Sequence, residues 1–170
     1  MSTDTIFSLG ADQLLSQWEL SFPDGIPTGG GAENVALRVD TSFTIPEQSV
    51  GTYTINKKGI TVPKTNAQTQ NTKTFTIEWR IDQDWITFED MKNWATAVYD
   101  HINGTALPEI SVRATVLLSL LDTQNTVKKL IRFKNCKPSG YSLSALDNAS
   151  GEPMRCTMTF IYVDFIVENA

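Results

Sequence analysis

Histidine and cysteine are scarce in this sequence, and their scarcity excludes most forms of nucleophilic catalysis. The chain of 170 residues has one histidine, His101, and two cysteines, Cys136 and Cys156. No serine occupies a G-x-S-x-G motif, and His101 is not close in sequence to either cysteine. His101 falls near the end of an expected helix, where a cation is favoured. We therefore expect a non-enzymatic protein in which His101 is a helix-end residue.

Redox, metal and phosphate chemistry also lack their sequence patterns. The cysteines form no C-x-x-C motif; a disulfide is one alternative if their strands are neighbours, and two reduced core side chains are the other. Gly29 to Gly31 do not fit the phosphate-binding loop pattern. One acidic cluster matches no EF-hand loop and suits a helix start better: Asp82, Asp84, Glu89 and Asp90. We expect no cofactor and no metal.

Long apolar runs and an excess of positive charge are missing as well. No apolar run approaches the ~20 residues that span a bilayer, so we expect no membrane segment. The first residues have no basic segment followed by an apolar one, so we expect no signal peptide and a protein made in a cytoplasm. The 14 basic and 19 acidic residues give a net charge of -5, which argues against a general nucleic-acid binder.

The sequence does contain regular alternation of apolar and polar residues. Residues 72–82 predict a strand with one buried and one solvent-exposed face. The buried face carries Phe75, Ile77, Trp79 and Ile81, and the exposed face carries Thr74, Thr76, Glu78, Arg80 and Asp82. Residues 34–45 predict a second such strand, with inward Val35, Leu37, Val39, Phe43 and Ile45, and outward Asn34, Ala36, Arg38, Asp40, Ser42 and Thr44. The exposed faces predict a surface that a partner covers or that something passes over.

Residues 46–71 predict a long β-hairpin arm. Tyr53 and Ile55 lie on one expected strand, residues 60–63 on the other, and Lys57-Lys58-Gly59 at the tip. A loop of this length in a compact domain is usually functional, so we interpret it as an interaction arm.

One helix and one basic strip complete the pattern. Residues 87–103 carry an apolar stripe at helical spacing, with Thr87 as a possible cap. Residues 126–137 contain five basic side chains and no acid. The strip is either a solvated strand edge or a contact surface for an acidic partner or neighbouring copy.

Further strands are expected at residues 16–22, 112–121, 126–136, 141–146 and 155–167. Together, these elements predict a mostly-β single domain, 1–170, with about seven to nine strands in a sandwich-like or barrel-like arrangement.

The ordered series of elements resembles the tail tube proteins of contractile-tailed bacteriophages. It comprises Trp18-Glu-Leu-Ser-Phe-Pro, Ile45-Pro-Glu, Gly59-Ile-Thr-Val-Pro, Phe75-Thr-Ile-Glu-Trp-Arg-Ile-Asp, the helix with Trp94, Lys129-Leu-Ile-Arg-Phe-Lys-Asn, Leu146-Asp-Asn-Ala-Ser-Gly-Glu-Pro and Thr159-Phe-Ile-Tyr-Val-Asp-Phe. Tube proteins of contractile bacteriocins and of type VI secretion share this fold.

The resemblance implies a structural virion protein. Hexameric rings would stack into the inner tail tube that conducts DNA, assembled in the host bacterial cytoplasm, with residues 1–15 as an N-terminal arm. Implied partners are other copies of the chain, the tail sheath, the baseplate hub, the tail terminator, and the tape measure protein and DNA in the lumen. Lumen candidates are Arg38, Asp40, Ser42, Thr76, Glu78, Arg80 and Asp82; inter-ring arm candidates are Tyr53, Ile55, Lys57, Lys58 and Gly59; sheath or subunit contact candidates are Lys128, Arg132 and Lys134.

Two alternatives stay open. The chain could be the tube subunit of a bacteriocin or type VI secretion device, which carries no DNA. It could instead be a β-sandwich module that binds sugar or protein through Trp79, Trp85 and Tyr53.

Overall fold

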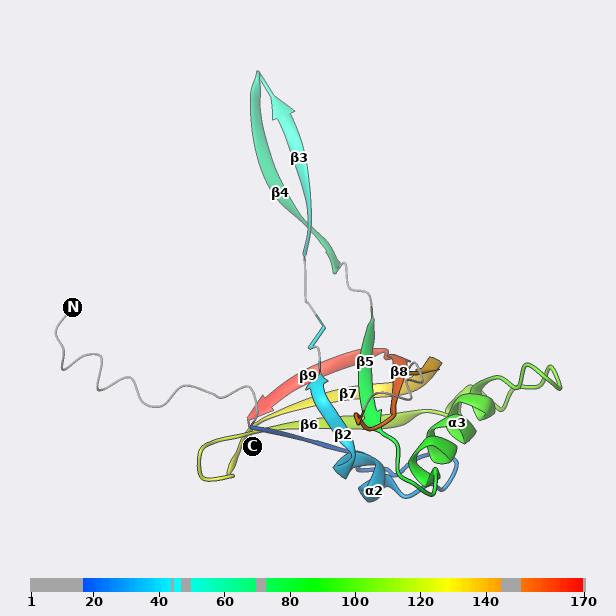
Figure 1. The fold of residues 1–170 in the computed structure, drawn as a ribbon. Helices are drawn as coiled ribbons and strands as arrows, with labels where there is room; N and C mark the ends of the chain where they lie inside the picture. Colours follow the sequence, from blue (N-terminus) through cyan, green and yellow to red (C-terminus); the bar gives the residue numbers. More distant parts are fainter. Residues whose placement is uncertain (1–16, 44, 47–49, 70–72, 145–150, 170) are drawn as a thin grey trace.

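An antiparallel sheet curls around an aromatic core, with one long helix packed against it and a two-stranded hairpin projecting from it (Figure 1). The computed structural model describes residues 17–43, 45–46, 50–69, 73–144 and 151–169. The expected N-terminal arm, 1–15, lies outside the described residues. The mostly-β prediction with a flanking helix is confirmed.

The main sheet has the strand order β1-β6-β7-β8-β5-β2, and β9 pairs with β7. The hairpin strands β3 and β4 form a separate two-stranded sheet. All strand pairs are antiparallel. In chain order the elements are β1 Trp18–Ser21, α2 Ala32–Leu37, β2 Val39–Phe43, β3 Val50–Lys57, β4 Ile60–Thr69, β5 Thr74–Arg80, α3 Ile86–Val98, a 3-10 turn Glu109–Ser111, β6 Ala114–Leu121, β7 Val127–Leu143, β8 Arg155–Ile161 and β9 Asp164–Asn169.

Strand β7 joins the two halves of the curled sheet. Its first part pairs with β6 and β9, and its last part, from Lys137 to Leu143, pairs with β8. The predicted separate strands at 126–136 and 141–146 are therefore one strand. Pro138 and Gly140 only shift the register, as residues of this kind do at bulges. The single last strand predicted at 155–167 is in fact two, β8 and β9.

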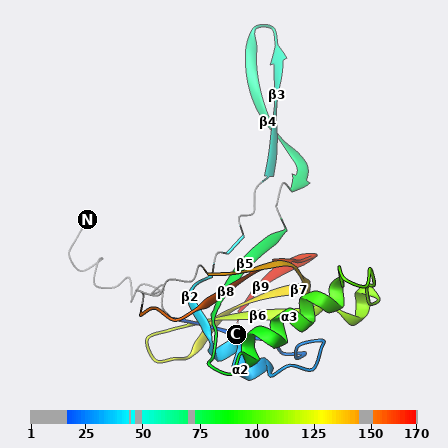
Figure 2. The same ribbon diagram turned by 45° about the vertical axis from the view of Figure 1, so that its right-hand side comes forward.

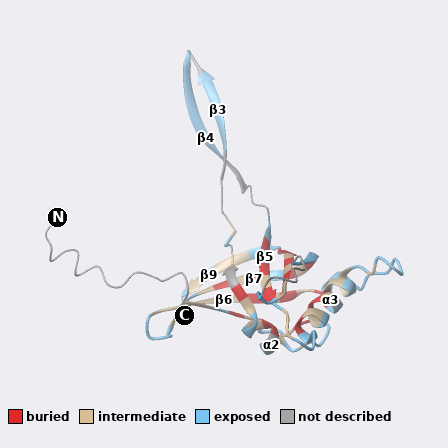
Figure 3. Cartoon of the chain, in the orientation of Figure 1, coloured by how far each residue is buried: buried red, intermediate tan, exposed pale blue. Residues whose placement is uncertain are grey.

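The core is built from aromatic rings that the strands place face to face. Phe75 stacks on Phe160 with ring centroids 5.3 Å apart, and Phe133 lies 4.7 Å from Phe75. The buried face predicted for β5 is confirmed for Phe75, Ile77 and Trp79. Red segments in Figure 3 follow this core through the sheet and α3.

Helix α3 is tied to the core by Trp94. The Trp94 ring lies 5.3 Å from Phe160, and its Nε1–H donates a hydrogen bond to the carbonyl of Val112 at 2.7 Å. The helix ends at Val98, five residues before the predicted end at 103, so His101 lies in the exposed turn that follows.

A short helix replaces the first part of the strand predicted at 34–45. Residues Ala32–Leu37 form α2, and the strand β2 begins only at Val39. Only Val35 and Leu37 alternate within Ala32–Leu37, which does not separate strand from helix, and the alanines and glutamate here favour a helix. The prediction that Leu37 faces inward is consequently wrong, since α2 buries Val35 and leaves Leu37 78% exposed.

The cysteine thiols are free and buried. Burial raises the pKa of Cys136 to about 12 and that of Cys156 to about 11. The reduced core alternative is confirmed.

Candidate functional site

A polar face extends across β5, β8 and the last part of β7, on the side of the sheet that does not meet α3. Thr76 on β5 pairs with Thr159 on β8, which in turn pairs with Gly140 on β7. The next row joins Glu78, Thr157 and Ser142 in the same way. We call this surface the open face, with members Thr74, Thr76, Glu78, Arg80, Arg155, Thr157, Thr159, Ile161, Gly140 and Ser142.

The open face is wider than the sequence alone suggested. The alternation of Cys156, Met158 and Phe160 with Thr157 and Thr159 was visible in the sequence and predicts the same two-sided strand. The register supplies what the sequence lacked, because it shows that these threonines continue the exposed side of β5. Hydroxyl groups dominate the open face, and its only carboxylate is that of Glu78.

The structure brings only part of the predicted outward set together. Thr76, Glu78 and Arg80 lie on the open face as expected. Arg38 is instead the residue that ends helix α2, although its carbonyl accepts a hydrogen bond from the Arg80 amide at 3.0 Å. The side chain of Ser42 lies outside what the structure describes.

The outward position predicted for Asp40 is wrong. Its side chain is only 5% exposed, with Oδ2 at 2.5 Å from Arg155 Nε and Oδ1 at 3.6 Å from Arg80 Nε. The Arg155 contact is an ion pair without hydrogen-bond geometry. Asp40 thus joins the end strand β2 to β5 and β8 electrostatically. The outward prediction failed because an irregular register with β5 breaks the alternation of side chains along β2.

Asp82 lies beyond the end of β5, before the turn that leads into helix α3 at Ile86. Its two carboxylate oxygens accept the amide hydrogens of Thr87 at 2.9 Å and Ile86 at 3.0 Å. Desolvation acts to raise the pKa of Asp82, but hydrogen bonds from Thr87, from its own amide and from Ile86 outweigh it and lower the pKa to about 2. Asp82 therefore caps the helix in place of Thr87, whose side chain is buried.

The hairpin β3–β4 is amphipathic, and the side chains that the structure describes on both of its faces are exposed. Tyr53, Ile55, Ile60 and Val62 share one face by register, and all four are exposed, with Ile60 at 66%. Thr52, Thr54, Asn56, Thr61 and Thr65 occupy the other face. Figure 3 shows the described hairpin residues as exposed. An isolated hairpin is at best marginally stable in water, so this apolar face is suited to a partner surface.

The predicted hairpin tip is confirmed. Lys57 pairs with Ile60, and the two residues between them have positive φ, 53° at Lys58 and 78° at Gly59. Two left-handed residues are the requirement of the tightest hairpin turns. The side chain of Lys57 lies outside what the structure describes.

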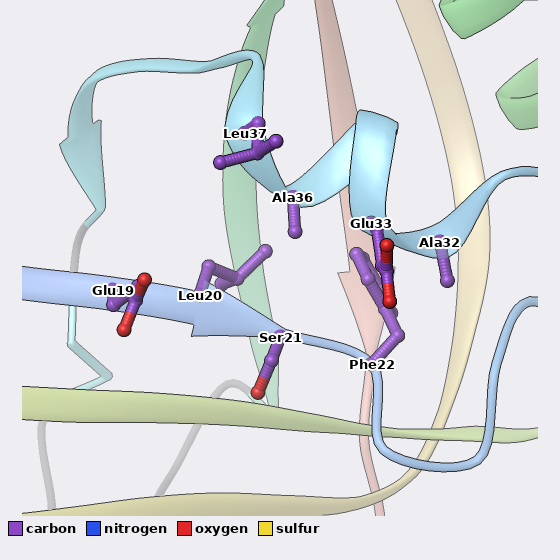
Figure 4. Close-up of a pocket in the computed structure, with 8 residues that line it drawn as sticks. All are labelled: Glu19, Leu20, Ser21, Phe22, Ala32, Glu33, Ala36 and Leu37. Atoms are coloured by element: carbon purple, nitrogen blue, oxygen red, sulfur yellow. The ribbon is translucent and has the colours of Figure 1, made fainter.

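A groove of about 490 Å³ opens between β1 and α2 (Figure 4). Leu20, Phe22 and Ala36 line its apolar part, with Leu37 at one end. Glu19 and Glu33 are its charged members, and both are exposed. An adjoining hollow that shares Glu19, Leu20, Ala36 and Leu37 continues toward Asp40.

The basic strip is largely engaged in ion pairs at the surface. Lys128 Nζ lies 3.1 Å from Asp122, and Arg132 lies 3.5 Å from Glu168 on β9. Lys134 is exposed opposite Asp164 in the β7–β9 register. These pairs leave a mixed-charge surface on the β7–β9 side rather than a strong positive patch.

Other classes of site find little support in the described residues. Within them, no group of three or more histidine, cysteine or acidic side chains could hold a metal ion. The helices in the same part of the chain are too short or too polar to cross a bilayer. Trp79 is 0% exposed and cannot stack on a ligand, which removes one of the three aromatic residues expected of a sugar-binding module.

No protein-family model and no curated protein matches the sequence. Solved structures do match in fold. The chain is similar to one in the PVC extracellular contractile injection system, sheath–tube complex in the extended state, with TM-score 0.61 and 14% identity over 100% of this chain and 99% of that one. A chain in the PVC sheath/tube terminator has a TM-score of 0.64 and 14% identity, over 95% of this chain and 99% of that one. A chain in the six-fold symmetrised baseplate of the anti-feeding prophage has a TM-score of 0.64 and 9% identity, over 94% of this chain and 97% of that one.

Proposed function

We propose that this chain is the tube subunit of a contractile injection device. The observation that carries the proposal is the fold match along the whole chain to a chain from a sheath–tube complex. The subunits would form hexameric rings, the rings would stack into a hollow tube, and a sheath would surround it. The symmetry of the anti-feeding prophage baseplate supports six copies for the ring.

Unpaired strand edges support lateral assembly into rings. Within the described residues, the end strands β1 and β2 each pair on one side only, and Lys137–Leu143 of β7 has β8 as its sole strand partner. Free edges of this kind attract further strands, and closure into a ring removes them. We infer that sheets of neighbouring subunits continue one another around the ring.

The open face is the surface that we assign to the lumen. It combines threonine and serine hydroxyls with Glu78, Arg80 and Arg155. Because the carboxylate of Asp40 lies against both arginines, opposite charges offset one another. A wall without net positive charge does not retain a polyanion by counterion release. Either a protein cargo or DNA could slide along it.

DNA conduction in a phage tail is the second candidate, because the charge balance of the open face would let DNA pass as well as protein. The comparisons concern injection systems, which makes a device without DNA the first candidate. Purified particles from producing cells would separate the two: nuclease-protected DNA inside a capsid would favour the phage tail, and its absence would favour the injection device.

The remaining partners follow from the tube geometry. Lys128, Arg132 and Lys134 lie on the β7–β9 surface, away from the open face, and we assign that surface to the sheath or a neighbouring subunit. The terminator and the baseplate hub would bind the two ends of the tube, and a tape measure protein would occupy the lumen during assembly.

Electron microscopy of the purified protein at high concentration tests the assembly, and thiol labelling tests the lumen. Thr76→Cys on the open face should react with a bulky polymer maleimide as a monomer and be protected in tubes. Thr96→Cys, exposed on α3, is the matched control that reports on the outside. A protein that stays monomeric even on a baseplate template would refute the tube, and equal labelling of Thr76→Cys in both states would refute the lumen assignment.

A further inference from the structure

We propose that the groove between β1 and α2 of one subunit receives the hairpin β3–β4 of a subunit in the adjacent ring. The inference rests on the proposed tube function, and it names the receiving surface on a second copy of this chain. Three features carry it: the positions of the two surfaces, their apolar character and their opposite charge.

The hairpin and the groove lie at opposite ends of the subunit. Strand β2 begins directly after α2 and runs toward the hairpin, so its length separates the two features. Figures 1 and 2 show the hairpin rising from one side of the body and α2 on the other side in both views. A hairpin that leaves one ring would thus meet the groove end of the next ring.

Both surfaces expose apolar side chains that their own subunit does not cover. The hairpin offers Tyr53, Ile55, Ile60 and Val62 on one face. The groove offers Leu37, which is 78% exposed, and the half-buried Ala36 (Figure 4). Leu20 also lines the groove, but it is 4% exposed and already belongs to the core. Contact between them would remove both apolar patches from water, and apolar burial is the main driving force of association.

Charge complementarity selects this pairing over others. Residues 50–69 contain three lysines and no acid, and Lys58 and Lys64 are exposed there. Residues 17–37 contain three acids and no base, and Glu19 and Glu33 line the groove. Opposite potentials of this kind fix register and suppress wrong partners.

The resulting contact is head-to-tail, because two different surfaces of the same chain meet. A heterologous contact that does not close on itself generates an open filament. Stacking along the tube axis would therefore use the hairpin and the groove, while ring closure would use the strand edges.

Charge reversal on each side tests the pairing. Lys58→Glu with Lys64→Glu, or Glu19→Lys with Glu33→Lys, should leave rings intact but raise the concentration needed for tube growth about tenfold, since two like charges then face each other. The four substitutions combined in one chain should restore growth to near the original concentration. Lys92→Glu on the exposed side of α3 is the matched control and should leave growth unchanged.

Cross-linking gives a second readout that does not depend on charge. Lys58→Cys and Glu33→Cys in one chain should yield ladders of linked subunits under oxidation in tubes, because the native thiols are buried and do not compete. Tubes that form without such ladders, or a combined variant that does not regain growth, would overturn the groove assignment while the tube function stands. Groove variants that stack normally but lose sheath binding would overturn it too. Failure to form rings at all would count against the proposed function instead.

Discussion

Asp40→Asn is expected to destabilise the subunit by about 2 kcal/mol. Removing one partner of a fully buried ion pair costs about 3–5 kcal/mol, because the other charge stays in a desolvated site. Here Asp40 is almost fully buried, but the side chains of Arg155 and Arg80 are 34% and 54% exposed and can recover hydration. The loss of unfolding free energy should therefore be smaller than the about 3–5 kcal/mol of a fully buried pair.

Urea unfolding followed by tryptophan fluorescence measures this cost. With a slope of about 2 kcal/mol per molar urea, the midpoint should fall by about 1 M. Trp79 and Trp94 are both buried, so their emission reports on the core that the ion pair adjoins. Because Asp40 holds the end strand β2, ring formation should weaken together with stability.

Glu152→Gln is the matched control for the Asp40 prediction. Glu152 also lies 3.5 Å from Arg155, but its side chain is 75% exposed. An exposed pair contributes little, so the control should change stability by less than about 0.5 kcal/mol. Equal effects of the two substitutions would refute the reasoning, since burial would then not decide the strength of the pair.

Three further predictions test other parts of the structure. Asp82→Ala should lower the free energy of unfolding by about 1 kcal/mol, because it removes the cap of α3. This difference from the parent should persist above pH 4 and disappear as the pH falls toward 2, where the parent carboxylate becomes protonated. Gly30→Ala should lower the free energy of unfolding by about 1–2 kcal/mol, because the added Cβ would lie 2.6 Å from the carboxylate carbon of Asp90 on α3. Gly140→Ala is its control: the added Cβ meets nothing within 4 Å, so the free energy of unfolding should fall by less than about 0.5 kcal/mol. Cys136 and Cys156 should resist a thiol reagent at pH 8 until the chain is unfolded; rapid reaction of the folded protein would contradict their burial.

The parts of the fold that the sequence predicted well are those where one local pattern is long and regular. Strand β5 has strict alternation over its whole length, so its buried face followed directly from period two. The hairpin tip at Lys58-Gly59 followed from a glycine between two alternating runs.

The errors arise where distant residues decide the local structure. Asp90 is 59 residues from Gly31 and accepts its amide hydrogen at 3.0 Å at the start of α2, a contact that no window of local sequence contains. Burial of Asp40 likewise depends on Arg155 from β8. The threonines of β8 joined the open face only through strand register, which alternation alone does not define.

The two sets of unsatisfied groups on this subunit differ in kind, and the difference matters for the order of assembly. Sheet edges offer backbone hydrogen bonds, which are short-ranged and demand a set register. The hairpin and groove offer exposed lysines and glutamates, whose attraction acts over about 10 Å at moderate salt. Salt should therefore weaken stacking between rings more than closure within a ring. Tubes formed at low ionic strength should then separate into rings, before the rings separate into monomers, as salt is added; simultaneous loss of both in size-exclusion chromatography would contradict the assignment of the charged surfaces to the tube axis.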